Sequence, residues 1–188
     1  AARGMDAIIN CTVVRPHPVH AFRVNVLGAY NVMRAAVAHG IRRVVHTGPQ
    51  QVTLRAPAGY WGNRDLSPDV PSRPGDSLYI LTKYLGQEIC RIFAEEHDLE
   101  VPALLFSSFV NPETPPPRPL GAFPFSVSWE DAAEAMRGAL RAPSFPHPFE
   151  PFFILGDLPH GRYSNEKAKR LLRWQPRDTL EAHWRRGE

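Results

Sequence analysis

The amino-terminal part of the 188-residue chain alternates strand-like and helix-like segments, and this alternation most constrains its fold. Residues 6–14 are a short apolar run rich in β-branched side chains, which predicts a parallel strand buried on both faces. Residues 21–39 show helical spacing that ends at Gly40, and residues 43–47 predict a second strand. A strand, a helix and a strand with short connections predict a βαβ unit, and therefore a parallel sheet with flanking helices.

The rest of the chain continues this alternation. The helix at 21–39 is expected to bury the apolar face formed by Val24, Leu27, Tyr30, Ala35 and Val37. Further on, we expect a helix from Tyr79 to about His97, a strand at 101–106, a helix at 129–140, a strand at 152–155 and a helix at 165–172. A polar loop at 48–75 is longer than most loops of a compact domain, which indicates a function for it.

Composition narrows the class of protein. A chain with 43% hydrophobic and 22% charged residues is ordinary for a single globular domain. No apolar run approaches the length of a membrane span and the chain does not begin like a signal peptide, so we expect a cytoplasmic protein without a membrane partner. The net charge is only +3 and acidic residues are interspersed among the basic ones, so no nucleic-acid partner is expected. Cys11 and Cys90 lack metal or redox spacing and are interpreted as buried small hydrophobes, and no metal site is predicted.

Tyr79 and Lys83 form the clearest candidate for chemistry. Asp76 or Ser77 can cap the helix that carries them, and its expected apolar face is Leu81, Leu85, Ile89 and Ile92. Residues four apart share one face of a helix, so the Lys83 ammonium can approach the Tyr79 phenol. A nearby positive charge lowers a tyrosine pKa, which suits a general acid or base. The same spacing also occurs on solvated helices without any function.

The motif Ser-x-Tyr-x-x-Thr-Lys at residues 77–83 resembles the active-site helix of the extended short-chain dehydrogenases, the NAD-dependent epimerase/dehydratase family. Other segments resemble patterns of this family in the same order along the chain, at residues 6–10, 25–32, 42–45, 126–133 and 171–176. The last segment carries Arg173 where the family pattern has a glycine. The segments at 25–31 and 76–83, and the short stretch between Pro112 and Trp129, look most like those of the uronate dehydrogenases.

This resemblance implies a Rossmann-like α/β fold with two parts. Residues 1–111 would form a partial Rossmann core with the Tyr79 helix, and residues 112–188 a small C-terminal substrate region packed on the same domain. The family's glycine-rich phosphate-binding turn precedes the segments matched here, so we expect an N-terminally truncated fold that binds NAD or NADP weakly by itself. The resemblance also implies a sugar or sugar acid as substrate and a homodimer or larger oligomer.

The resemblance assigns roles to individual residues. Tyr79 would be the catalytic acid or base, Lys83 would lower its pKa and bind the cofactor ribose, and Thr47 is the third candidate catalytic residue. The other expected cofactor contacts are Asn10, Cys11, Thr12, Asn25, Ser107 and Ser108, and the expected substrate contacts are Gln50, Gln51 and Arg118. One position departs from the family pattern, because Pro49 stands where the catalytic serine is expected. Thr47 could replace that serine only through a shift of two residues.

Two alternatives remain open at this stage. A nucleotide-sugar epimerase or dehydratase shares the same motifs, but it usually carries a larger substrate region than the residues between Pro112 and Trp129 can build. A non-catalytic scaffold or binding protein of the same family is favoured by Pro49 and by the lack of a glycine-rich turn in the 188 residues.

Overall fold

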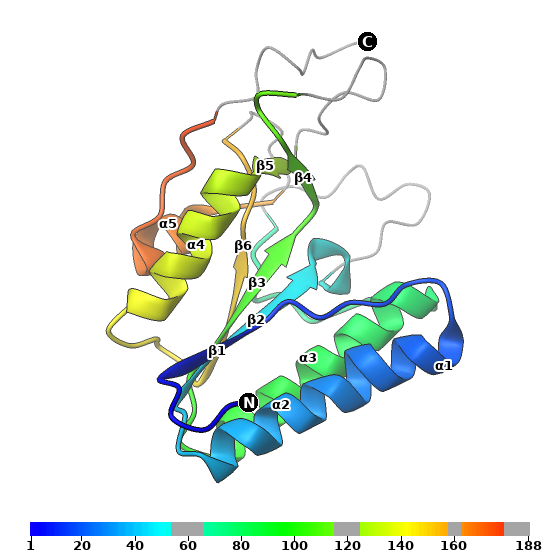
Figure 1. Cartoon of the computed structure of the whole chain (residues 1–188). Helices are drawn as coiled ribbons and strands as arrows, with labels where there is room; N and C mark the ends of the chain where they lie inside the picture. Colours follow the sequence, from blue (N-terminus) through cyan, green and yellow to red (C-terminus); the bar gives the residue numbers. More distant parts are fainter. Residues whose placement is uncertain (54–65, 115–124, 158–162, 179–188) are drawn as a thin grey trace.

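The computed structural model describes residues 1–53, 66–114, 125–157 and 163–178. Four parallel strands form its main sheet in the order β1, β2, β3, β6 (Figure 1). Their bounds are β1 Ala7–Asn10, β2 Arg43–Pro49, β3 Val101–Phe106 and β6 Phe149–Phe153. Two short strands, β4 Ser108–Val110 and β5 Ser126–Ser128, pair in parallel beside it. The Rossmann-like α/β fold expected from the sequence is confirmed.

Helices cover both faces of the main sheet (Figure 1). On one face lie α1 Pro18–Ala21, the π-helical turn η1 Phe22–Leu27, α2 Gly28–Ala38 and α3 Leu78–Glu96. On the other face lie α4 Trp129–Arg141 and α5 Glu166–Leu172, and the short 3₁₀ turn η2 Gln50–Val52 follows β2. Each helical layer packs its apolar side chains against one face of the sheet and so forms a separate core. All six residues of β3 are buried between these two cores.

The first strand differs from its prediction. β1 covers only residues 7–10 of the predicted 6–14, and it is the edge strand of the sheet. Ile9 is therefore 42% exposed, and Cys11, which we expected to be buried, is exposed as well. An apolar run rich in β-branched residues predicts a strand, but it does not reveal which of its faces the rest of the described chain covers.

The apolar faces predicted for two helices are also wrong. Leu27 is 51% exposed and Tyr30 is 38% exposed, whereas the helical segment 18–38 buries Ala21, Asn25, Ala29, Met33 and Ala36. On α3 the buried residues are Thr82, Lys83, Gly86, Gln87, Cys90 and Ala94, and Ile92 of the predicted face is exposed.

Close packing between the two helices explains this result. A Cβ atom at Gly86 would lie only 2.2 Å from the carbonyl oxygen of Asn25, so the two helices approach each other closely at this point and leave no room for a larger residue there. The π-helical turn at 22–27 also inserts an extra residue per turn, which rotates every later side chain out of the 3.6-residue pattern used for the prediction.

The carboxyl-terminal elements follow their predictions more closely. The helices predicted at 129–140 and 165–172 are α4 and α5, with ends that differ by one residue. β6 begins three residues before the predicted strand at 152–155 and belongs to the same sheet as the amino-terminal strands. β4 and β5 were not predicted, because three-residue strands with serines at their ends carry too little periodicity.

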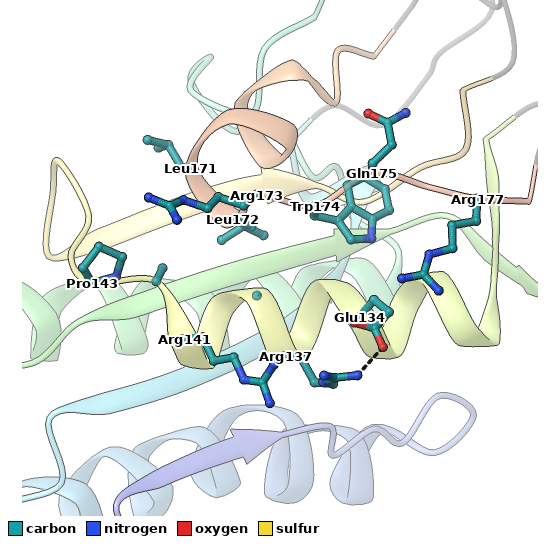
Figure 2. Close-up of a pocket in the computed structure, with 12 residues that line it drawn as sticks. Glu134, Arg137, Arg141, Pro143, Leu171, Leu172, Arg173, Trp174, Gln175 and Arg177 are labelled. Carbon is teal, nitrogen blue, oxygen red and sulfur yellow. Dashed lines mark hydrogen bonds and ion pairs between the residues drawn. The ribbon is translucent and has the colours of Figure 1, made fainter.

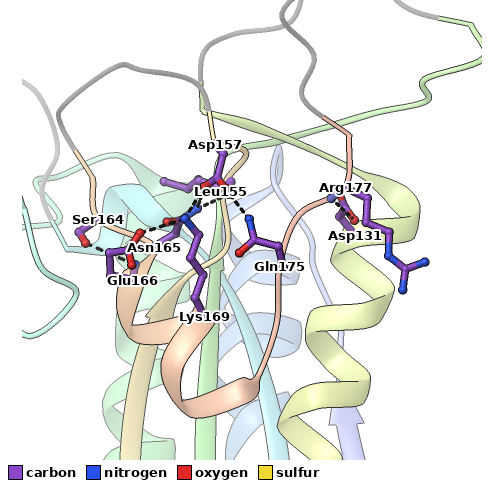
Figure 3. A network of polar contacts seen from close by, with 9 residues as sticks. All are labelled: Asp131, Leu155, Asp157, Ser164, Asn165, Glu166, Lys169, Gln175 and Arg177. Carbon is purple, nitrogen blue, oxygen red and sulfur yellow. Dashed lines mark hydrogen bonds and ion pairs between the residues drawn. The ribbon is translucent and has the colours of Figure 1, made fainter.

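The segment that follows α5 is fastened to α4 and to the end of β6 (Figure 3). The carboxylate of Asp131 accepts hydrogen bonds from the backbone N–H groups of Arg177 and Asp178, at 2.9 to 3.0 Å. The Trp174 indole donates to the Asp131 carbonyl at 2.8 Å. Nearby, Asp157 accepts hydrogen bonds from the side chains of Asn165, Lys169 and Gln175. These bonds hold residues 174–178 in one position on the surface of α4.

No helix in the described ranges is both long and apolar enough to cross a membrane. Within the same ranges, no three His, Cys, Asp or Glu side chains are placed to hold a metal ion. The cytoplasmic location stays a prediction.

Candidate active site

The candidate site lies where β1 and β2 end and α3 begins. In an open parallel sheet, ligands bind at the carboxyl ends of the strands, where the connecting segments leave the sheet. Here these segments are residues 11–17 after β1 and residues 50–53 after β2. Tyr79 and Lys83 stand on the first turns of α3, one helical turn apart.

Lys83 is the central buried cation of the site. Its side chain is only 4% exposed, and its ammonium donates to the carbonyl of Thr12 at 3.3 Å. Asn10 fixes that residue, because its side-chain oxygen accepts from both the Thr12 hydroxyl, at 2.8 Å, and the Thr12 backbone N–H. Burial lowers the pKa of Lys83 to about 8, and the thiols of Cys90 and Cys11 oppose this shift. The structure thus brings together four of the residues predicted to bind the cofactor: Asn10, Cys11, Thr12 and Lys83.

His46 was not predicted as a residue of the site, yet it is buried close to Lys83. It belongs to β2, and its Nδ1 lies 3.5 Å from the Asn10 amide nitrogen and 3.4 Å from the Cys90 sulfur. Its Nε2 is buried and has no hydrogen-bond partner in the part of the chain that the structure describes. Burial, with a smaller contribution from Lys83, lowers the pKa of His46 to about 3, so the imidazole is neutral at physiological pH. Burial likewise raises the pKa of Cys90 to about 12 and keeps it a thiol.

The surroundings of Tyr79 differ from the prediction. Burial raises the pKa of Tyr79, and the charge and hydrogen bond of Arg15 only partly oppose this shift. The guanidinium carbon of Arg15 lies 4.7 Å from the centroid of the Tyr79 ring. Lys83 is not among the groups that shift the Tyr79 pKa, because its ammonium is directed toward Thr12. The expectation that Lys83 lowers the pKa of Tyr79 is wrong for this arrangement, in which Arg15 is the adjacent cation.

Asn25 connects the segment after β1 to the Tyr79 helix. Its amide oxygen accepts from the Val14 N–H at 3.0 Å, and its amide nitrogen donates to the Val14 carbonyl at 2.7 Å and to the Thr82 hydroxyl at 2.9 Å. The side chain is 2% exposed and its polar atoms are occupied within the chain. Asn25 therefore positions the segment that carries Arg15, and the cofactor contact expected of Asn25 stays a prediction.

The end of β2 offers no free hydroxyl at the position where the family pattern has a serine. Pro49 is the last residue of β2 and pairs with Phe106 of β3. The hydroxyl of Thr47, the candidate replacement, donates to the Asn10 carbonyl at 3.0 Å and so points toward β1. The structure therefore engages Thr47 in strand-to-strand bonding and does not present it at the loop.

Three glutamine side chains lie close to the end of β2, and their buried amide oxygens have no hydrogen-bond partner among the described residues. Gln50 and Gln51 were predicted as substrate contacts, and both belong to η2. Gln87 was missed, although it follows Lys83 by four residues on the same face of α3. Its amide oxygen lies 3.8 Å from the point where a Cβ of Gly48 would stand. A buried oxygen without a partner is costly, so these three acceptors are candidates to receive a hydroxyl or amide donor.

The serines after β3 are placed differently from one another. Ser108 begins β4, and its hydroxyl lies 2.5 Å from that of Ser126 in β5, so it joins the two short strands. Ser107 lies half-buried in the bend between β3 and β4. Arg118, the predicted substrate contact, lies outside the described residues.

Comparison with known proteins agrees with this geometry. Residues 2–128 match the model of the NAD dependent epimerase/dehydratase family. The chain belongs to this family. A uronate dehydrogenase from Agrobacterium fabrum is 29% identical over 159 residues, which cover 84% of this chain and 55% of that protein. An L-arabinose 1-dehydrogenase (NAD(P)(+)) from Haloferax volcanii is 32% identical over 118 residues, which cover 54% of this chain and 44% of that protein.

Solved structures of the family superpose on nearly the whole chain. The uronate dehydrogenase from Agrobacterium tumefaciens has a TM-score of 0.77 and 27% identity, and the match covers 96% of this chain and 64% of that one. The glucuronic acid dehydrogenase from Chromohalobacter salexigens has a TM-score of 0.79 and 25% identity, with the same coverage of both chains. The chain spans about half the length of the curated relatives that it matches.

Proposed function

We propose that these residues form the catalytic and substrate-binding part of an NAD(P)-dependent oxidoreductase that acts on a sugar acid of the uronate class. Membership of the family and the sugar and uronate dehydrogenases among the relatives support a sugar-acting oxidoreductase. The observation that carries the proposal is the placement of Tyr79 and the buried Lys83 beside Asn10 and Thr12, at the carboxyl ends of β1 and β2.

In this proposal Tyr79 exchanges a proton with the substrate hydroxyl that is oxidised. Lys83, Thr12 and Asn10 would hold the cofactor, which would supply the hydride acceptor that the oxidation needs. The Lys83 ammonium has three N–H donors and one described acceptor, the Thr12 carbonyl, so donors remain for ribose oxygens. Gln50, Gln51 and Gln87 have the unpaired oxygens that a polyhydroxylated ligand satisfies.

Arg15 acts on Tyr79 through its charge. Oxidation requires the phenolate as base, and a guanidinium beside the ring favours that form over the phenol. The Asn25 bonds to Val14 keep Arg15 at this distance. Arg15 is therefore a positioning and tuning residue, and it takes part of the role that the sequence suggested for Lys83.

The test is a fusion of this chain to the amino-terminal segment of the Agrobacterium fabrum uronate dehydrogenase, assayed for reduction of NAD with glucuronate. The Tyr79→Phe variant should lose about 10²- to 10⁴-fold in kcat, since general acid–base catalysis is worth that much. Tyr84→Phe is the matched control, because it removes a hydroxyl from the residue that directly follows Lys83 on the same helix and therefore points in another direction. A Tyr79→Phe fusion as active as the Tyr84→Phe fusion would rule out the catalytic assignment.

A second candidate function is that of a non-catalytic binding protein of this family. The observation that favours it is the end of β2, where Pro49 has no hydroxyl and Thr47 donates to Asn10. This function predicts that the fusion folds and binds glucuronate but reduces no NAD. Product analysis in the same assay distinguishes oxidation from epimerisation, which a nucleotide-sugar enzyme of the family would perform.

A further inference from the structure

A groove of about 720 Å³ opens between α4 and the segment 171–177, and arginines line it (Figure 2). Arg137 and Arg141 project from the second half of α4, whereas Arg173 and Arg177 belong to the segment after α5. We call this groove, with its four arginine side chains, the arginine groove. Its volume lies within the range of small-molecule sites, roughly 300 to 1,000 Å³.

The positive charge of this groove is mostly uncompensated. Among the described residues that line it, Glu134 is the one acidic side chain, and it pairs with Arg137. The guanidinium groups of Arg141, Arg173 and Arg177 form no ion pair with any described residue. Like charges that line one hollow repel one another, so this arrangement favours the binding of an anion along the groove.

The backbone of Arg173 gives an independent reason to regard the groove as functional. Its φ of 52° and ψ of 39° place it in the left-handed region, and among the described residues no other non-glycine residue has a positive φ. Glycine adopts this conformation without strain, and the family pattern noted above has glycine here. The backbone of Arg173 is therefore strained where a glycine would not be, and its long cationic side chain lines the groove.

The walls of the groove are held in place by contacts that do not involve the arginine side chains. A Cβ atom at Gly138 would lie 2.7 Å from the Leu172 carbonyl oxygen, so α4 and the end of α5 are in close contact. Asp131 holds the backbone of Arg177, and Trp174 donates its indole N–H to Asp131. A groove with fixed walls loses little conformational entropy when a ligand binds.

The arginine groove is separate from the candidate active site. α4 and α5 cover one face of the sheet, whereas α3, with Tyr79 and Lys83, covers the other (Figure 1). We propose that the arginine groove binds a small organic polyanion, a metabolite with two or more phosphate or carboxylate groups. Planar guanidinium groups bind the oxygens of both kinds of group through paired hydrogen bonds.

The test measures binding of tripolyphosphate and of citrate to the 188-residue chain by calorimetry at low and high salt. We expect saturable binding of at least one probe at one site, and weaker binding at high salt because counterions screen the charges. Arg141→Gln and Arg177→Gln should each weaken binding by about tenfold or more, as expected for the loss of a charged hydrogen bond. Arg34→Gln on α2, which removes the same charge far from the groove, should leave binding unchanged.

Arg173→Gly separates binding from folding. Glycine relieves the left-handed backbone, so this variant should melt at the same or a higher temperature while its affinity for the probe falls by about tenfold. Binding that Arg34→Gln weakens as much as Arg141→Gln would overturn the proposal and indicate a general effect of net charge. Lack of saturable binding by the parent chain, or full affinity in Arg173→Gly, would also overturn it.

Discussion

At the scale of single residues, burial rather than charge pairing sets the chemistry of the candidate site. The pKa values of Lys83 and His46 are lowered, and those of Tyr79 and Cys90 are raised, with burial as the largest cause in all four cases. The sequence predicted Tyr79 and Lys83 from their spacing. It could not predict Arg15, because a contact between a loop and a helix 64 positions later has no local pattern.

Gln87 could have been predicted from the sequence, since it follows Lys83 by four residues and therefore lies on the same face of α3. Its neighbour Cys90 was assigned correctly as a buried thiol, and Cys11 was not. Burial of a small residue next to a strand depends on which elements cover it, and composition does not carry that information.

His46 should make the chain sensitive to mild acid. Its pKa is about 3 in the folded state and about 6.5 in the unfolded chain. Between these values the unfolded state binds a proton that the folded state excludes, so the stability contributed by the neutral imidazole is lost as the pH falls below about 6.5. Between pH 6 and pH 4 this contribution should decrease by about 2 to 3 kcal/mol.

Urea unfolding of the parent chain and of His46→Gln at both pH values isolates this contribution, since the carboxyl groups common to the two proteins cancel in the difference. The parent chain should lose more stability than the variant over this interval. Equal losses would show that His46 is accessible to protons in the folded state.

At the scale of helices and strands, the sequence predicted which elements exist better than how they face one another. Periodicity identified β2, β3, α3, α4 and α5 within a few residues, because each has a long apolar run or a clear helical repeat. Periodicity did not predict which side chains of α2 are buried, because the π-helical turn at 22–27 rotates the later residues around the helix axis. A π-helical turn has no sequence signal as plain as a proline or a glycine.

Gly86→Ala should destabilise the chain by about 1 to 3 kcal/mol, the usual cost of an overpacked contact. Alanine is the better helix former by about 1 kcal/mol, but its Cβ would meet the Asn25 carbonyl oxygen at 2.2 Å, so the steric effect is larger. Gly28→Ala is the matched control, because its nearest contact, with the Arg23 carbonyl oxygen, is an ordinary 3.6 Å. Thermal unfolding should show a lower Tm for the first variant and an unchanged or higher Tm for the second.

A Gly86→Ala protein as stable as the Gly28→Ala protein would mean that the two helices separate easily. In that case the Asn25 bonds to Val14 and Thr82 would not hold Arg15 and Tyr79 in a fixed arrangement, and the tuning role of Arg15 would fail with them.

At the scale of the whole molecule, the layer of α1, η1, α2 and α3 exposes more of the described large apolar side chains than the opposite layer does. Exposed large hydrophobic residues gather on α1, η1, α2 and α3: Val19, Phe22, Leu27, Tyr30, Val37 and Ile92, with exposures of 38 to 51%. The opposite layer of α4 and α5 exposes Trp129 and Leu140 on α4 and carries the arginine groove. Scattered exposed hydrophobics are normal on any protein, but several on one helical layer favour an interface.

We therefore expect a homodimer formed through the layer of α1, η1, α2 and α3, as the sequence also predicted. Sedimentation velocity at about 20 µM should show a dimer, the range in which a standard-sized interface is occupied. Leu27→Glu puts a charge into the centre of this layer at a side chain that is 51% exposed, so it should shift the protein to monomer without loss of the fold. Leu140→Glu on α4, at a residue that is 36% exposed, should leave the dimer intact. A parent chain that sediments as a monomer would exclude this interface, and dissociation by Leu140→Glu alone would move it to the other face of the sheet.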